Sequence, residues 1–290
     1  EILYTLRKFP TPEQAPRLRW IQMHFAGLDR ALKNPLVQAE DIEVTSASGI
    51  HATPIAEYCI GMMLAFNLKI PDMLRYQGDG KWAENAHDVF RPTPLRNKTL
   101  GIAGYGSIGR ELARLAQSFG MRVLASKRDP RKPEDSEYSE PGLGDPMGDI
   151  PERIYPGEAL ATMARDCDYL VVTLPLTKAT HHIINEDVFK AMKKTAVIIN
   201  IARGEVIDEA AMISALAAEK IGGAALDVFE QEPLPAGSPL WNFDNVIISP
   251  HVSGNNTDYH RRAAALFIEN LKRYIEKRPL FNRLERERGY

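Results

Sequence analysis

The sequence predicts an α/β protein built on a doubly wound parallel sheet. Short, continuously apolar segments alternate with helix-like segments along most of the chain. A glycine-rich turn joins the first of these strands to its helix, and polar residues gather where the later strands end. Continuous apolar strands that are separated by helices are typical of a parallel sheet covered on both faces.

The glycine-rich turn lies within residues 99–120, TLGIAGYGSIGRELARLAQSFG. Gly104 permits a tight turn, Gly106 lets the backbone approach a phosphate, and Gly109 lets the helix pack closely on the strand. The unpaired N–H groups at the start of the helix favour an anion, and they belong to Ser107 and Ile108. This pattern predicts a dinucleotide site, and a turn that serves packing alone is the alternative.

The rest of the central chain repeats the pattern of strand and helix. Apolar runs predict strands at 122–125, 169–174, 196–201, 223–228 and 246–249. Helical patterns, each with Asp, Asn or Glu near its start, lie at 157–165, 185–192 and 208–219. The apolar run 55–66 follows Thr53 and Pro54 and is too short to span a bilayer, so we expect a buried helix. Residues 129–156, rich in Pro, Gly and acidic residues, predict an exposed loop, with a functional lid as the alternative.

Length and composition narrow the class of protein. The 290 residues suggest about two domains. A formal net charge of −2, with scattered basic residues, argues against a nucleic-acid partner. The two cysteines, Cys59 and Cys167, lie in apolar contexts, which favours a reducing cytoplasm. The histidines and cysteines show no metal-ligand spacing, so we expect no metal site. Because the longest apolar run is too short to span a bilayer, we also expect no membrane partner.

Four polar residues follow three of the later strands. They are Arg203, Asp227, Glu232 and His251. Ligands of an open parallel sheet bind beyond the carboxyl ends of its strands, so we expect these side chains to share one crevice with the dinucleotide. A histidine titrates near neutral pH, a carboxylate beside it fixes its ring, and arginine offers a planar fork to a substrate carboxylate.

Each of these residues alone has an ordinary structural explanation. Arg203 could pair with Glu205 at the surface, Asp227 could end a strand, and His251 could be a packing residue. Together, beside a predicted nicotinamide site, they indicate a catalytic set. The other histidines are expected to be ordinary polar residues, namely His24, His51, His87, His181, His182 and His260.

Several motifs together resemble the D-isomer-specific 2-hydroxyacid dehydrogenases, in particular the glyoxylate and hydroxypyruvate reductases. The matching segments run from about Leu18 to about Lys272 in the family's order, and they are WIQMHFAGLDR, GIAGYGSIGRELA, TLPLTKATHHIIN, INIARGEVIDE, GAALDVFEQEPLP and ISPHVSG. The resemblance implies a Rossmann cofactor domain at 56–254, inserted in a smaller flavodoxin-like α/β substrate domain formed by 1–55 and 255–290. Members usually have another strand and helix before the point at which Glu1 stands, so we expect the amino-terminal part to be incomplete.

The resemblance also assigns roles to residues of the site. Arg203 would bind the substrate's carboxylate and carbonyl, Glu232 would pair with His251, and His251 would be the acid or base. The backbone at Ala26 and Gly27 would hold the substrate carboxylate. Asp227 would lie on the cofactor side near the nicotinamide, together with Thr173, Pro175, Ala202 and Gly254.

One position departs from the family's NAD-using members, which carry an acidic residue at the end of the second strand. This chain has Lys127 there, flanked by Ser126 and Arg128, and Asp129 comes only afterwards. Two cations and a hydroxyl suit a 2′-phosphate, so the sequence favours NADP(H). The alternative is that Asp129 reaches the ribose and NAD(H) is used.

The predicted function is that of an NAD(P)-dependent D-2-hydroxyacid dehydrogenase working mainly as a reductase of small 2-ketoacids. The alternative is a cofactor-sensing binding protein of the transcriptional corepressor type on the same fold. Formate dehydrogenases resemble the chain less, because they have Gln where Glu232 stands. The resemblance implies a homodimer, and the apolar helix at 55–66 is a candidate for its interface.

Overall fold

The computed structural model describes residues 1–28, 31–135 and 137–286. The chain divides into two compact units. We call Thr53–Asp135 with Gly144–Gly254 the central unit, and Glu1–Ala52, Ser136–Leu143 and Asn255–Tyr290 the terminal unit. The first boundary falls a few residues before the expected position, and part of the long loop belongs to the terminal unit.

The central unit contains a seven-stranded sheet in which every pair of neighbours is parallel. Its order is β10-β9-β8-β7-β4-β5-β6. The strands are β4 (Thr99–Ala103), β5 (Arg122–Ser126), β6 (Arg153–Tyr155), β7 (Tyr169–Val172), β8 (Val197–Asn200), β9 (Gly223–Leu226) and β10 (Val246–Ile248). The chain winds outward in both directions from β4 and β7, which confirms the doubly wound fold. In such sheets ligands bind beyond the carboxyl ends of the strands at this switch point.

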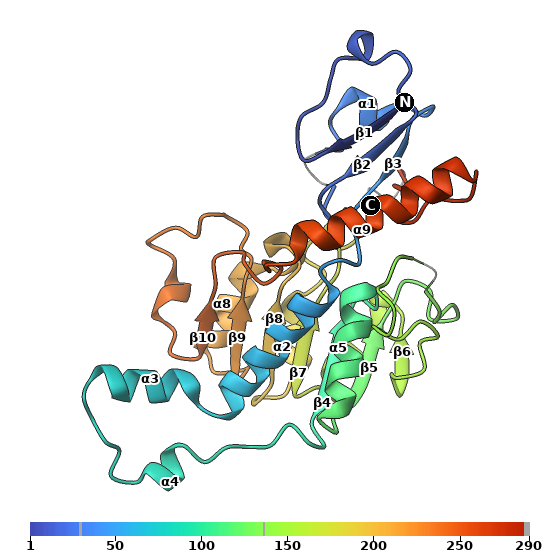
Figure 1. The fold of residues 1–290 in the computed structure, drawn as a ribbon. Coiled ribbons are helices and arrows are strands. Elements are labelled where there is room, and N and C mark those ends of the chain that lie inside the picture. The colour runs from blue at the N-terminus through green and yellow to red at the C-terminus, as the bar shows by residue number, and fades with distance from the viewer. Residues whose placement is uncertain (29–30, 136, 287–290) are drawn as a thin grey trace. The chain divides into compact units, whose positions relative to one another are not determined.

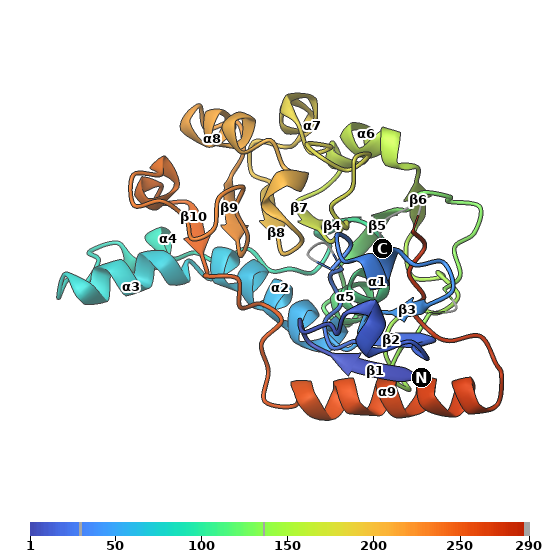
Figure 2. The same ribbon diagram turned by 90° about the horizontal axis from the view of Figure 1, so that it is seen from above.

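Helices cover both faces of this sheet. Figure 2 shows α6, α7 and α8 along one face and α2 and α5 along the other. Their bounds are α2 (Ala52–Asn67), α5 (Ser107–Ser118), α6 (Leu160–Ala164), α7 (Glu186–Ala191) and α8 (Glu209–Ala217). Two more helices, α3 (Ile70–Gly78) and α4 (Ala86–Val89), form an arm that reaches away from the sheet (Figure 1).

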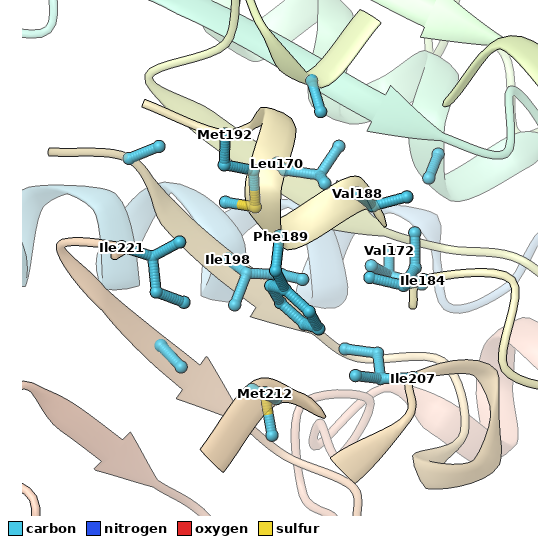
Figure 3. Packing of buried hydrophobic residues seen from close by; sticks show 14 of the residues in the cluster. Leu170, Val172, Ile184, Val188, Phe189, Met192, Ile198, Ile207, Met212 and Ile221 are labelled. Atoms are coloured by element: carbon cyan, nitrogen blue, oxygen red, sulfur yellow. The ribbon is translucent and has the colours of Figure 1, made fainter. Parts of the chain in front are cut away.

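The apolar residues of these layers form two buried clusters, one on each face of the sheet. Figure 3 shows the α7 side chain Phe189 among Ile198, Ile207 and Met212. Cys59 and Cys167 are free and buried, and burial raises the pKa of the Cys167 thiol to about 12. Both cysteines therefore behave as small apolar residues of the core.

The long loop differs from the exposed segment that its composition predicted. Part of the loop is hydrogen-bonded to α5, because the guanidinium of Arg110 donates to the carbonyl oxygens of Pro133 and Asp145. The hydroxyl of Tyr105 donates to the Asp145 carboxylate at 2.6 Å, and Asp145 is only 6 % exposed. The loop also contains β6, which forms by pairing with β5. These contacts join residues 20 to 40 positions apart, so local composition could not reveal them.

The terminal unit holds a separate parallel sheet of three strands, in the order β1-β2-β3. These are β1 (Ile2–Thr5), β2 (Trp20–Met23) and β3 (Glu43–Thr45). Its helices are α1 (Pro35–Gln38) and the long α9 (Tyr259–Ile275). Trp20 stacks against Phe267 and Tyr274 of α9, which ties the two ends of the chain into one core.

Short 3₁₀ turns complete the described secondary structure. They are η1 (Pro12–Gln14), η2 (Gly157–Ala159), η3 (Gly204–Val206) and η4 (Pro239–Asn242). Across the described ranges, none of the helices has the length and apolar character that crossing a membrane requires.

Candidate active site

A histidine and a carboxylate meet at the carboxyl edge of the central sheet. His251 follows β10, and its Nδ1 lies 2.8 Å from Oε2 of Glu232, which follows β9. The other carboxylate oxygen of Glu232 accepts from the backbone N–H of Phe229 at 3.2 Å. Because Nδ1 is held by the carboxylate, Nε2 is the ring nitrogen left to exchange a proton with a substrate.

The backbone around His251 is held by a buried carboxylate. Asp227, fully buried, accepts from the hydroxyl of Ser249 at 2.6 Å and from the N–H groups of Val252 and Ser253 at 2.8 and 2.9 Å. His251 has a φ of 56°, a conformation that non-glycine residues rarely adopt. Donors on both sides of the histidine therefore stabilise this turn through Asp227.

Two residues that support this loop, Tyr58 and Ser249, were not predicted from the sequence. The hydroxyl of Tyr58, on α2, hydrogen-bonds the Ser249 hydroxyl at 2.7 Å, across 191 positions of the chain. Burial raises the pKa of Tyr58 to about 12, so its hydroxyl stays protonated at neutral pH. An apolar helix with one tyrosine carries no signal for such a contact, although the first serine of ISPHVSG, Ser249, could have suggested one.

Arg203 stands at the end of the neighbouring strand, β8. The buried amide of Asn200 donates to the Arg203 carbonyl at 3.1 Å and accepts from Ala202 N–H at 3.1 Å. The next residue, Gly204, touches the turn that carries Glu232, because an added Cβ would lie 1.8 Å from the carbonyl carbon of Phe229. Arg203, Glu232 and His251 thus follow three adjacent strands, as their positions in the sequence predicted.

The glycine-rich turn has the geometry that a pyrophosphate requires. Gly104 has a φ of 104°, and a Cβ on Gly109 would lie 2.6 Å from the Gly104 carbonyl oxygen. Gly106 has an ordinary φ of −95°, and a Cβ there would meet no described atom within 4 Å. Neither the backbone nor protein packing explains this glycine, so the open space above it fits a bound dinucleotide. The helix α5 begins at the next residue, Ser107.

Lys127, which directly follows β5, binds its own loop. Its ammonium donates to the carbonyl oxygens of Lys132 and Glu134, the latter at 2.8 Å. Burial lowers the pKa of Lys127, with the nearby charge of Arg110 as a second cause. Asp129, the alternative ribose ligand, instead pairs with Arg131 at 3.0 Å.

The remaining predicted cofactor residues lie around the switch point or after the last strand. Thr173 follows β7, and its hydroxyl donates to the carbonyl oxygens of Ala103 and Gly104. The buried Ser126 at the end of β5 accepts from Gly104 N–H at 3.3 Å. Pro175 and Ala202 lie in the loops after β7 and β8, and Gly254 ends the central unit.

The predicted substrate residues Ala26 and Gly27 lie after β2 in the terminal unit. Just before them, His24 is 8 % exposed, and its Nε2 lies 3.1 Å from His260 Nδ1. Burial lowers the pKa of His24, and the charge of His260 adds to this. Within the ranges that the structure describes, no group of three or more His, Cys, Asp or Glu side chains is placed to hold a metal ion.

The chain is similar to known proteins of one enzyme family. Residues 60–253 match the family model described as D-isomer specific 2-hydroxyacid dehydrogenase, NAD binding domain. A glyoxylate reductase of Thermofilum pendens is 34 % identical over 260 residues, which cover 89 % of this chain and 72 % of that protein. A glyoxylate reductase of Korarchaeum cryptofilum is also 34 % identical over 260 residues, covering 89 % of this chain and 74 % of that protein.

Solved structures show the same relationship. A D-isomer specific 2-hydroxyacid dehydrogenase from Xanthobacter autotrophicus, in complex with NADPH and MES, superposes with a TM-score of 0.80 at 31 % identity, covering 99 % of this chain and 85 % of that one. A family protein from Aeromonas salmonicida superposes with a TM-score of 0.79 at 32 % identity, covering 98 % and 85 %. The chain therefore belongs to the D-isomer-specific 2-hydroxyacid dehydrogenase family, and it is an NAD(P)-dependent oxidoreductase that acts on 2-hydroxy acids.

Proposed function

We propose that the protein reduces small 2-ketoacids, such as glyoxylate or hydroxypyruvate, with NADPH as the hydride donor. The contact of 2.8 Å between His251 and Glu232 carries this proposal, since it prepares the imidazole to give a proton. The relatives named glyoxylate reductase support the substrate class.

The residues of the site divide the work of the reaction. When bound, the nicotinamide supplies a hydride to the keto carbon. Arg203 holds the substrate's carboxylate and polarises its carbonyl. Protonated His251 gives its Nε2 proton to the carbonyl oxygen, so no free alkoxide forms, and Glu232 stabilises the charged ring. In the oxidising direction, neutral His251 accepts the proton of the substrate hydroxyl.

We assign the substrate carboxylate a second set of contacts, the backbone N–H groups at Ala26 and Gly27. For the cofactor, Gly106 leaves room for the pyrophosphate, in the turn that Gly104 and Gly109 shape. The N–H groups that meet it are those of Ser107 and Ile108. Around the nicotinamide we place Thr173, Pro175, Ala202, Asp227 and Gly254.

NADP(H) is the proposed cofactor, with NAD(H) as the alternative. Ser126, Lys127 and Arg128 form the end of the site that would receive the 2′-phosphate. Two observations support this choice: Asp129 is engaged with Arg131, and the relative from Xanthobacter autotrophicus was solved with NADPH. An acidic ribose ligand, which would repel a phosphate, is replaced by Lys127.

A panel of 2-ketoacids, each assayed with NADPH and NADH, tests the proposal. We expect turnover of the smallest ketoacids and a higher kcat/KM with NADPH. Binding of either cofactor without turnover of any ketoacid would contradict it and favour the corepressor-type alternative, which the relatives do not support.

We further propose a cytoplasmic homodimer. The two buried, free cysteines support a reducing compartment. The predicted interface helix, α2, buries one face in the central core, while the arm of α3 and α4 exposes Leu74, Trp82 and Val89. Trp82 is 91 % exposed, so we expect a second copy to cover this arm. Light scattering should give twice the chain mass of 32.5 kDa, and Trp82→Arg should shift the mass toward one chain.

A further inference from the structure

Three loops at the carboxyl edge of the central sheet lie against one another. They comprise residues 182–184, 203–209 and 229–232. Backbone hydrogen bonds join the first two. The N–H of His182 donates to the Glu205 carbonyl at 2.9 Å, and the N–H of Ile184 donates to Val206 at 3.2 Å. Ile184 also pairs with Ile207 in an isolated parallel bridge. The segment that follows Arg203 is therefore held by the loop after β7.

The side chain of His182 reaches the third loop. Its Nε2 lies 2.8 Å from Oε1 of Glu230, two residues before the catalytic carboxylate. His182 has a φ of 51°, a backbone conformation that persists only where its surroundings hold it. The sequence predicted only an ordinary polar residue at His182. The contact with Glu230 joins residues 48 positions apart and was not predicted.

Glu230 is also locked to the start of α8. Its Oε1 accepts from the N–H of Glu209 at 3.2 Å, and the Glu209 carboxylate accepts from the N–H of Glu230 at 3.2 Å. Burial raises the pKa of Glu209; the hydrogen bond from Glu230 N–H acts against this rise, and the charge of the Glu230 carboxylate adds to it. The His182 ring donates a hydrogen bond to the same Glu230 oxygen, which stabilises the carboxylate in this position.

The turn that contains Glu230 carries Glu232. Phe229 N–H donates to one Glu232 oxygen, and the other oxygen holds His251. On its far side the turn touches Gly204, where even a Cβ would collide with Phe229 and Glu230. A shift of Glu230 would therefore displace Glu232 from His251 and move the backbone beside Arg203.

We propose that His182 is a positioning residue for hydride transfer: by bonding Glu230 it fixes the turn 229–232, and thereby the Glu232 carboxylate against His251. This inference rests on the proposed function for its kinetic readout. It means that the loop after β7 also helps to build the site. It also gives His182 a role that the neighbouring His181 does not share.

The matched variants are His182→Leu and His181→Leu. The His181 ring stacks on His182 at 4.0 Å between centroids, so its loss removes a ring from the same loop and leaves the bond to Glu230 intact. We expect His182→Leu to lower kcat for ketoacid reduction about tenfold, since small misplacements of catalytic groups have effects of this size or larger. The KM for NADPH should change less than twofold, and His181→Leu should behave as the wild type.

Two further variants separate positioning from general stability. His182→Gln can still donate to Glu230, so we expect it to restore most of kcat, while Glu230→Leu, which has no acceptor for His182, should resemble His182→Leu. In His182→Leu the pH at which reduction falls to half its maximum should move downward, because the imidazolium loses its fixed carboxylate. A lower melting temperature with kcat and pH profile unchanged would overturn the proposal.

A readout without turnover keeps this inference separable from the proposed function. In protein carrying ¹⁵N-labelled histidine, the signals of His251 are assigned with His251→Gln. We expect His182→Leu to shift the His251 signals and His181→Leu to leave them in place. Unshifted signals in His182→Leu would refute the positioning role, whereas absence of ketoacid turnover in the wild type would refute only the proposed function.

Discussion

The carboxylate of Asp227 lies 2.6 Å from the hydroxyl of Ser249, and the two residues enclose the turn that presents His251. Asp227 is fully buried, and its other donors are backbone N–H groups beyond the histidine. A buried carboxylate that accepts three hydrogen bonds stabilises a loop more than an exposed ion pair does. The conformation of His251 therefore depends on a residue that need not touch the substrate.

Asp227→Asn should impair catalysis more than folding. The amide offers one acceptor, and its NH₂ group opposes an N–H donor of the loop, so the His251 turn loosens. We expect kcat to fall about 10- to 100-fold, with a melting temperature lower by a few degrees. Asp244→Asn is the matched control, because Asp244 is exposed and pairs only with Arg75 among the interactions described. Wild-type kcat in Asp227→Asn would refute this view of the loop.

Replacement of the acid or base and of its partner should have graded effects. His251→Gln should lower kcat by about 10² to 10⁴, the range for loss of a general acid. Glu232→Gln should lower kcat less than His251→Gln does. It should also lower the pH above which the rate of reduction declines, because the charged His251 ring loses its carboxylate. Steady-state rates from pH 5 to pH 9 measure both effects. Unchanged cofactor binding in both variants is the control for folding.

Gly106 and Gly109 allow a test of the cofactor site that does not depend on the substrate. A Cβ on Gly106 enters open space, so Gly106→Ala should keep the melting temperature and weaken NADPH binding at least tenfold. A Cβ on Gly109 meets the Gly104 carbonyl, so Gly109→Ala should also destabilise the protein, by about 1–3 kcal/mol. Tight NADPH binding by Gly106→Ala would mean that the open space is not the pyrophosphate site.

Lys127 should govern the choice between cofactors. Lys127→Asp removes a cation, releases the carbonyl groups of the following loop and restores the acid of NAD-using relatives. We expect the KM for NADPH to rise about tenfold or more, while the KM for NADH falls or stays the same. Lys132→Met removes a charge from the same loop and keeps the carbonyl that Lys127 binds, so it should leave the ratio of the two constants unchanged.

His24 should make the stability of the protein depend on pH. Its pKa in the folded protein lies below the ordinary value of 6.5, because burial and the charge of His260 disfavour the cation. Below pH 6.5 the unfolded chain binds a proton that the folded protein refuses, so stability is lost as the pH falls toward the folded pKa. Thermal unfolding between pH 8 and pH 5 should show this decline, and His24→Gln should flatten it.

Much of the fold could be predicted because its signals are local. The strands β4, β5 and β7 to β10 are runs of apolar residues, and helix starts carry their own capping residues. The short strand β6 was missed, since its three residues form a strand only by pairing with β5. The exposed loop predicted at 129–156 was wrong in part for the same reason, because Arg110 of α5 and Tyr105 of the glycine-rich turn bind it.

The sequence by itself determined the class of the sheet and the glycine turn, and it placed Arg203, Glu232 and His251 after three separate strands, because residue type and spacing along the chain carry that information. Only the tertiary structure decided how these groups are held. Tyr58 supports Ser249 and His182 bonds Glu230 across long stretches of chain, and the Lys127 ammonium turns to its own loop. Such contacts depend on which loops the folded sheet brings together, and no periodicity in the chain encodes that choice.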